Sequence, residues 1–308
     1  MNILPPPPPS VIRQNLRLLI IVSSILLCLN SLFYLYKPYY LLRPYQIEQD
    51  NNLDRIILNR PSNKIENVTN EVYNLLDIAN APGPNFSTTR ETRVKLFLQG
   101  IGNCSQQSTG MGEVLSNHNF NYSIVHFLPK TGLYEGNGHT IINIIRDSIS
   151  FLADPVLKMI PIVEDEMHNK RFMNIQDLYN RSNIYQMNRY KSVINLNNEF
   201  WEPNFTAAYA EVSQSDMEKY YSFTESFIRL LGLHDDSNSK RKLVNGVALL
   251  CGDLPKFKVN QDDYIKLCCT YPNFVFLKYL GRFFVYNVYC LILLVFIYVL
   301  KYKILRFN

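Results

Sequence analysis

Cys104, His139 and Asp154 are the residues whose types and order fit chemistry at a thiol. A cysteine becomes a nucleophile when its thiolate is favoured. The N-terminus of a helix favours the thiolate through unpaired amides and the positive end of the helix dipole. A neighbouring imidazole can then act as base and acid, while a carboxylate orients that ring. These residues are therefore candidates for a nucleophile, a general base and an orienting group.

Cys104 stands at the start of a helix predicted over 104–115, directly after the glycine-rich run QGIGNC. Gly110 and Gly112 lie inside this helix, where glycine costs stability unless a neighbour packs closely against it. We therefore expect the helix to pack tightly on a sheet. Taken alone, Cys104 would be interpreted as a small buried hydrophobic residue, which is the usual role of a free cysteine.

A predicted hairpin brings His139 and Asp154 to one face of a sheet. The segments HTIINIIR (139–146) and ISFLAD (149–154) flank a two-residue turn. In this register Asp154 lies opposite Ile141, and His139 shares the face of Ile141 because it is two residues away. The two side chains are then diagonal neighbours within reach of each other. A slip of one residue would turn one of them to the opposite face.

Other patterns predict helices before Cys104 and antiparallel strands after it. Apolar residues at helical spacing, capping boxes and a β-branched segment are the signals used. The expected elements are helices over 62–79, from the box Thr88-x-x-Glu91 and from the box Ser215-x-x-Glu218, with a strand over 122–128. This order of elements predicts an α+β fold.

Two apolar segments near the ends of the chain, 16–36 and 283–300, are long enough to cross a bilayer. The first lacks a small-residue cleavage site and the second has aromatic residues at its edges, so we expect two transmembrane helices in contact with lipid. Basic residues beside the spans favour cytoplasmic termini and an exported central segment. The expected location is a two-pass membrane protein whose central domain is extracytoplasmic, in the periplasm or outside the cell.

The remaining segments are assigned from their composition and their position between the spans. The expected parts are a Pro-rich tail at 1–15, a linker at 37–61, a core at 62–160, a helical extension of unknown role at 161–282 and a basic tail at 301–308. The extension carries no pattern that indicates its role.

The composition argues against several other classes of protein. The net charge of +5, from 31 basic and 26 acidic residues, is too mild and too dispersed to predict nucleic-acid binding. The histidines show no metal-ligand spacing with cysteines, so we expect neither a zinc site nor a cofactor. A bridge from Cys251 to Cys268 or Cys269 stays open, because disulfide connectivity cannot be read from a sequence.

In order and spacing, the segments GNCSQQSTGMGEVL, GHTIINI and SFLADP resemble the transglutaminase-like superfamily, whose core is papain-like. The resemblance covers roughly 62–160 and implies a cysteine-headed helix packed on an antiparallel sheet, here between two terminal transmembrane helices. It implies Cys104 as the nucleophile, His139 as the general base and acid, and Asp154 as the orienting carboxylate. By analogy with papain-like enzymes, Gln99 and the backbone amide of Cys104 are candidates for the oxyanion hole.

The resemblance implies acyl chemistry on a protein or peptide-like amide, through a thioester that water or an amine resolves. Hydrolysis and transfer are not separable from the sequence. Two departures favour another class: Thr140 and Ile141 stand where the family often carries an aromatic residue, and no tryptophan precedes the aspartate motif. The alternative is a catalytically inactive scaffold or binding protein in a membrane assembly such as surface-polysaccharide biosynthesis. The comparison with surface-polysaccharide biosynthesis is based only on the layout of two terminal spans.

Overall fold

The computed structural model describes residues 9–34, 42–45, 63–78, 89–130, 138–146, 149–164, 170–180, 185–187, 193–195, 201, 206–232 and 238–307. The chain divides into two compact units. The larger unit is Leu42–Thr270, and the smaller unit combines Met1–Leu41 with Tyr271–Asn308.

The larger unit contains both helices and strands. Its helices are α2 (Asn63–Ile78), α3 (Arg90–Leu98), α4 (Cys104–Ser116), α5 (Ile175–Tyr179), α6 (Gln214–Leu231), α7 (Asn238–Cys251) and α8 (Gln261–Thr270). Its strands are β1 (Leu42–Tyr45), β2 (Asn121–Pro129), β3 (His139–Arg146), β4 (Ile149–Ala153), β5 (Ile160–Glu164), β6 (Lys170–Phe172), β7 (Tyr185–Met187), β8 (Val193–Asn195), β9 (Thr206–Ser213) and β10 (Phe257–Asn260).

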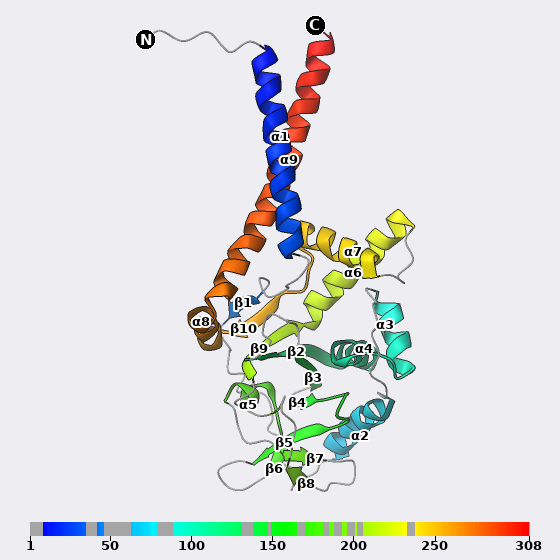
Figure 1. Cartoon of the computed structure of the whole chain (residues 1–308). Helices are drawn as coiled ribbons and strands as arrows, with labels where there is room; N and C mark the ends of the chain where they lie inside the picture. The colour runs from blue at the N-terminus through cyan, green and yellow to red at the C-terminus, as the bar shows by residue number, and fades with distance from the viewer. Residues whose placement is uncertain are drawn as a thin grey trace. The chain divides into compact units, whose positions relative to one another are not determined.

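Within the described residues, the strands form a main sheet in the order β1-β10-β9-β2-β3-β4 and a smaller sheet in the order β6-β5-β7-β8. Neighbouring strands of the main sheet are antiparallel except β1, which runs parallel to β10. Helix α4 lies against β2 and β3, and α3 lies beside α4 (Figure 1). The predicted α+β class, with an antiparallel sheet packed against helices, is confirmed.

Strands β2 and β3, two neighbouring inner strands of the main sheet, are buried on both faces. Ile124 and Ile142 belong to one apolar cluster, which also contains Met111 of α4. Val125 and Ile141, their immediate neighbours in the chain, belong to a second cluster. Successive side chains of a strand point to opposite faces, so α4 covers the face of Ile142 and a different group of residues covers the face of Ile141.

Helix α4 approaches its neighbours closely at two glycines. A Cβ atom on Gly110 would lie 2.5 Å from Cβ of Phe97 in α3, and one on Gly112 would lie 2.7 Å from the ring of Tyr122 in β2. Both distances are well below the roughly 3.5–4.0 Å at which two carbon atoms pack. The expected tight packing on a sheet is confirmed at Gly112, and Gly110 allows an equally close approach to α3.

The predicted boundary of the core at residue 160 is wrong. Strand β9 lies between β2 and β10 in the main sheet, so the segment 161–282 supplies strands of the core as well as helices. Strand β1, inside the predicted linker 37–61, also joins this sheet beside β10. These pairings join residues that are far apart in sequence, and local hydrophobic patterns do not reveal them.

Two helix starts differ from the predicted capping boxes. Thr89 caps α3 by accepting a hydrogen bond from the amide of Thr92, whereas the predicted cap Thr88 lies outside the described residues. Ser213 caps α6, and Ser215 lies in the first turn of that helix. Near Ser213 the sequence offers two serines that are each followed three residues later by an acidic residue. The end of β9 at Ser213 decides which of them is the cap.

The smaller unit is a pair of antiparallel helices, α1 (Pro9–Tyr34) and α9 (Pro272–Phe307) (Figure 1). In this pair the Nδ2 atom of Asn287 donates to the carbonyl of Ser23 at 3.2 Å. Within the described residues, one segment, Arg282–Leu300, is long and apolar enough to cross a membrane. The predicted apolar helix at 283–300 is therefore present, and the span at 16–36 stays a prediction.

The predicted tails at the two ends of the chain are shorter than expected. Residues 9–15 belong to α1 rather than to an extended Pro-rich tail, and residues 301–307 belong to α9 rather than to a separate basic tail. Pro9 is compatible with a helix start, because a first-turn residue needs no intrahelical partner for its nitrogen. Cys251, Cys268 and Cys269 are free thiols.

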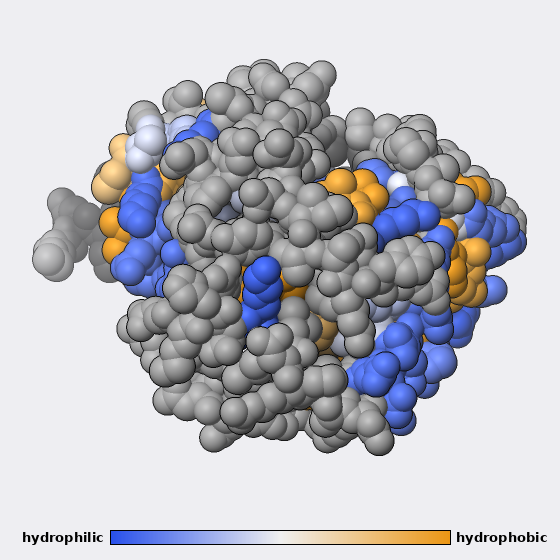
Figure 2. Space-filling view, turned by 90° about the horizontal axis from the view of Figure 1, so that it is seen from below, coloured by the Kyte–Doolittle hydropathy of each residue, from blue (hydrophilic) through white to orange (hydrophobic). Residues whose placement is uncertain are grey.

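Figure 2 shows one face of the chain, coloured by the hydropathy of each described residue. Hydrophilic residues form most of the described surface, and hydrophobic residues form small separate patches. Scattered apolar residues of this kind are normal on a protein surface. The described part of this face therefore does not mark a large apolar interface.

The substitution Gly110→Ala tests the close approach of α4 to α3. We expect it to lower the free energy of unfolding by about 1–3 kcal/mol, because the added methyl group overlaps Phe97. Thermal unfolding of the full chain in detergent measures this loss. Gly246→Ala in α7 is the matched control, because a Cβ atom there meets nothing within 4 Å, and it should be neutral or stabilising by up to about 1 kcal/mol. Equal stability of the two variants would contradict the packing described.

Candidate active site

The hairpin register brings His139 and Asp154 together as predicted. Ile142 of β3 lies opposite Ala153 of β4, and the register continues without a shift to the strand ends at the turn. The Nε2 atom of His139 lies 2.6 Å from Oδ2 of Asp154. Both residues are buried, with 4% of His139 and 0% of Asp154 exposed. The turn residues 147–148 lie outside the described part of the chain.

Four nitrogen atoms surround the carboxylate of Asp154. Its Oδ1 atom accepts hydrogen bonds from the backbone amides of Val156 and Leu157, each at 3.0 Å. Its Oδ2 atom accepts one from the indole Nε1 of Trp201 at 3.0 Å and also faces His139. A buried carboxyl group whose two oxygens are both bonded is fixed in orientation, and its desolvation is compensated. Asp154 therefore holds the imidazole of His139 in one position.

Trp201 is a residue of the site that the sequence patterns did not reveal. It is 3% exposed, and its ring meets the ring of Phe127 edge-on with centroids 5.0 Å apart. It lies 47 residues after Asp154, so no local motif joins the two. Its being the only tryptophan of the chain is the one signal that could have drawn attention to it. An indole therefore reaches the aspartate from a distant part of the chain.

Cys104 heads α4, as predicted, and a capping box fixes the helix start. The side chain of Asn103 accepts from the amide of Gln106 at 3.1 Å, and the side chain of Gln106 accepts from the amide of Asn103 at 3.0 Å. The partly buried Sγ atom of Cys104 lies 4.0 Å from the carbonyl oxygen of Gly138. A Cβ atom at Gly138 would lie 2.4 Å from the carbonyl oxygen of Phe127. The position before His139 therefore requires a glycine.

The pKa values of the thiol and the imidazole are shifted toward an ion pair. Burial raises the pKa of Cys104, but its hydrogen bonds, chiefly the one with His139, and the charge of His139 together lower it by more than burial raises it. The net pKa of Cys104 therefore lies below its ordinary value. Burial lowers the pKa of His139, whereas Asp154 and Cys104 together raise it to about 9. Because Nε2 of His139 faces Asp154, Nδ1 is the nitrogen left for the thiol. An arrangement of this kind can activate a cysteine as a nucleophile.

Gln99 is not brought to the thiol. It is the C-cap residue of α3 and its side chain is exposed. Within the described residues, no hydrogen bond joins Gln99 to Cys104, His139 or Asp154. Its role in an oxyanion hole is therefore unsupported by contacts. The backbone amide of Cys104 lies in the first turn of α4, where amides have no intrahelical partner, and it stays a candidate donor.

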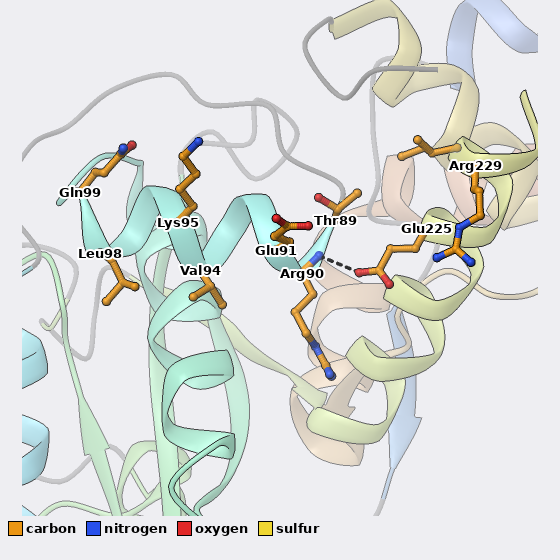
Figure 3. A pocket seen from close by; sticks show the side chains of 10 residues that line it. Thr89, Arg90, Glu91, Val94, Lys95, Leu98, Gln99, Glu225 and Arg229 are labelled. Atoms are coloured by element: carbon orange, nitrogen blue, oxygen red, sulfur yellow. Dashed lines mark hydrogen bonds between the residues drawn. The ribbon is translucent and has the colours of Figure 1, made fainter. Parts of the chain in front are cut away.

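Gln99 instead lines a groove of about 810 Å³ between α3 and α6. Figure 3 shows Lys95 and Gln99 on one side of α3, with Glu225 and Arg229 on the facing helix. The backbone amide of Arg90 donates to Glu225 at 3.2 Å and connects the two walls. The groove combines apolar and charged side chains and adjoins the loop that leads to Cys104.

Among the described residues, no group of three or more His, Cys, Asp or Glu side chains is arranged to hold a metal ion. In comparisons with known proteins, no family model, curated protein or solved structure matches this chain. A functional assignment therefore depends on the geometry around Cys104, His139 and Asp154.

The substitution Asp154→Asn tests the coupling of this carboxylate to His139. The folded-state pKa of His139, about 9, lies above the value of about 6.5 for an unfolded histidine. The stabilisation from the charged pair is therefore complete below about pH 6.5 and is lost as the pH rises through about 9. We expect the variant to lose about 2 kcal/mol of unfolding free energy near pH 6 and clearly less near pH 10.

Urea unfolding of the full chain, followed by the fluorescence of Trp201, measures both losses. Asp177→Asn is the matched control, because the buried Asp177 pairs with Arg171 at 2.6 Å and arginine does not titrate in this range. The loss in the control should be the same at both pH values. A loss for Asp154→Asn that is equally independent of pH would show that the imidazolium does not contribute.

Proposed function

We propose that this chain is a membrane-anchored, transglutaminase-like enzyme in which Cys104 attacks the carbonyl carbon of a carboxamide or peptide bond. The observation that carries the proposal is the position of His139 between two partners. Its Nε2 atom lies 2.6 Å from Asp154, and its imidazole lowers the pKa of the Cys104 thiol through a hydrogen bond and its charge. This order of thiol, imidazole and carboxylate is the one that nucleophilic catalysis by cysteine requires.

The residues divide the reaction between them. The thiolate of Cys104 adds to the carbonyl carbon, and the resulting oxyanion accepts a hydrogen bond from the backbone amide of Cys104 at the helix N-terminus. The imidazolium of His139 gives its proton to the departing amine as the C–N bond breaks, which leaves a thioester. Neutral His139 then takes a proton from water or from an acceptor amine that attacks the thioester. The C–S bond then breaks, which releases an acid or a new amide and restores the thiolate beside the imidazolium.

A test of this proposal needs an acyl donor, an acceptor and a matched cysteine variant. N-acylated dipeptides of glutamine and asparagine are suitable donors, and hydroxylamine is an acceptor whose hydroxamate product is measured by colour. We expect Cys104→Ala to abolish hydroxamate formation and His139→Ala to lower its rate by at least about 100-fold. Cys251→Ala, which removes an exposed thiol at the end of α7, should leave the rate unchanged. Hydroxamate formation by Cys104→Ala at the wild-type rate would refute the mechanism.

A second candidate function is a non-catalytic membrane scaffold or binding protein that keeps the fold without the chemistry. The observation that favours it is the exposed position of Gln99, which leaves the thiol without the side-chain oxyanion donor that the analogy with papain-like enzymes suggests. Under this alternative Cys104 would form no acyl intermediate. Mass spectrometry of the chain after incubation with the same dipeptides distinguishes the two, because only the enzyme would carry an added acyl group on Cys104.

We further propose that α1 and α9 cross the membrane together as an antiparallel pair. The apolar segment Arg282–Leu300 supports one span, and α1 lies along α9 within the smaller unit. The bond from Asn287 to the backbone of Ser23 satisfies a polar side chain within the apolar segment, as interhelical hydrogen bonds do in lipid. The basic residues beside the spans favour cytoplasmic termini and an exported central domain.

Protease protection in membrane vesicles tests this topology. Peptide tags added before residue 1 and after residue 308 should be protected or cleaved together, because an antiparallel pair places both ends on one side. Residues of the larger unit should show the opposite result. Tags with different protection, or a larger unit on the same side as the termini, would contradict the two-pass arrangement.

A further inference from the structure

Thr140 and His126 form a polar pair next to the site that the reaction above does not use. They lie opposite each other in the β2–β3 ladder, and the Nδ1 atom of His126 is 2.9 Å from the hydroxyl oxygen of Thr140. Thr140 is 4% exposed, so water does not readily satisfy this hydroxyl. A buried hydroxyl with one histidine partner still has hydrogen-bonding capacity to spare, since it offers one donor and two acceptor positions.

The alternation of β3 places Thr140 on the face that α4 covers. His139 shares the face of Ile141, whereas Thr140 shares the face of Ile142, which packs in one cluster with residues of α4. The hydroxyl of Ser108 in α4 donates to the carbonyl of Thr140 at 3.0 Å and holds the helix against this part of the strand. Cys104 lies four residues before Ser108, on the same side of this helix. The side chain of Thr140 is accordingly among the groups that lower the pKa of the Cys104 thiol, together with His139.

The single proton of the Thr140 hydroxyl can serve only one partner at a time. Burial and the nearby charge of Arg93 lower the pKa of His126 to about 4, so this imidazole is neutral at neutral pH. If its proton is on Nδ1, His126 donates to Thr140, and Thr140 is free to donate to the sulfur of Cys104. If its proton is on Nε2, Thr140 must donate to His126 and offers nothing to the sulfur. A thiolate at Cys104 therefore favours the first tautomer.

We propose that Thr140 is a positioning residue that donates a hydrogen bond to the Cys104 thiolate, with the Nδ1–H group of His126 as the donor behind it. The thiolate is then stabilised by His139 and Thr140, two neighbouring residues of one strand that point to opposite faces. Thr140 occupies one of the places where the sequence departs from the family it resembles, and the departure supplies a hydroxyl. The catalytic meaning of this bond rests on the proposed function, but the bond itself requires no substrate.

The pH dependence of Cys104 alkylation by iodoacetamide tests this bond in the full chain in detergent. Mass spectrometry of the peptide that contains Cys104 separates its reaction from that of the other cysteines. A hydrogen bond to a charged group is strong enough to shift a pKa by about one unit. We therefore expect Thr140→Val, which keeps the shape and removes the hydroxyl, to raise the apparent pKa of Cys104 by about one unit and to reduce the thiolate fraction about tenfold. Thr140→Ser, which keeps the hydroxyl, should behave as the wild type.

Variants of His126 give an order of effects that packing alone would not produce. His126→Asn can still donate to Thr140 from its side-chain amide and should leave the apparent pKa of Cys104 unchanged. His126→Phe removes the donor but leaves the hydroxyl free to donate to the sulfur, so its effect should be smaller than that of Thr140→Val. If Thr140→Val does not fold, Thr140→Ala takes its place in the same comparison.

An apparent pKa of Cys104 that is the same in wild type, Thr140→Val and Thr140→Ala would overturn the proposal. An effect of His126→Phe larger than that of Thr140→Val would overturn the assigned direction of the two hydrogen bonds. Neither result depends on finding a substrate. A raised pKa in Thr140→Val would support the bond even if no acyl donor were turned over, so failure of the proposed function and failure of this inference remain distinct.

Discussion

The hydrogen bond between His139 and Asp154 is the interaction on which the rest of the site depends. It occupies Nε2 of the imidazole, so Nδ1 is the nitrogen left for the thiol, and it helps to raise the pKa of His139 to about 9. A buried charge is costly unless it is paired and hydrogen-bonded. The amides of Val156 and Leu157 and the indole of Trp201 complete the shell around Asp154. The charged pair of His139 and Asp154 is thus stabilised by hydrogen bonds to groups from different parts of the chain.

The main sheet and α4 position the thiol by a simple geometric constraint. Because adjacent residues of β3 point to opposite faces, a helix packed on one face would not normally meet side chains of both. In the proposed arrangement Cys104 meets both, because it heads α4 beside Gly138, where β3 begins. Glycines at 110, 112 and 138 remove the side chains that would keep the helix, its neighbours and the strand apart. The proposed chemistry therefore depends on packing as much as on the three reacting side chains.

The local features of this site could be predicted from sequence, and its long-range features could not. The register that joins His139 to Asp154 follows from a two-residue turn and strand alternation, and the start of α4 follows from a glycine-rich run before Cys104. Trp201 reaches the site, and β9 and β1 join its sheet, from distant segments of the chain. No rule of residue spacing predicts these contacts. Gln99 was placed by its distance along the chain alone, and the end of α3 directs it to the surface instead. Contacts between residues that are close in the sequence could be predicted, whereas contacts between distant segments could not, whatever the residue types.

The most direct test of the central claim is the apparent pKa of Cys104 in the full chain, with and without His139. Alkylation by iodoacetamide, measured as a function of pH on the peptide that contains Cys104, gives this value. An ion pair predicts a pKa well below about 8.5 in the wild type and a higher value in His139→Ala. His118→Ala, which removes an exposed histidine of the α4–β2 turn, should not change it. An ordinary pKa in the wild type that does not respond to the loss of His139 would contradict an activated thiol and favour the scaffold.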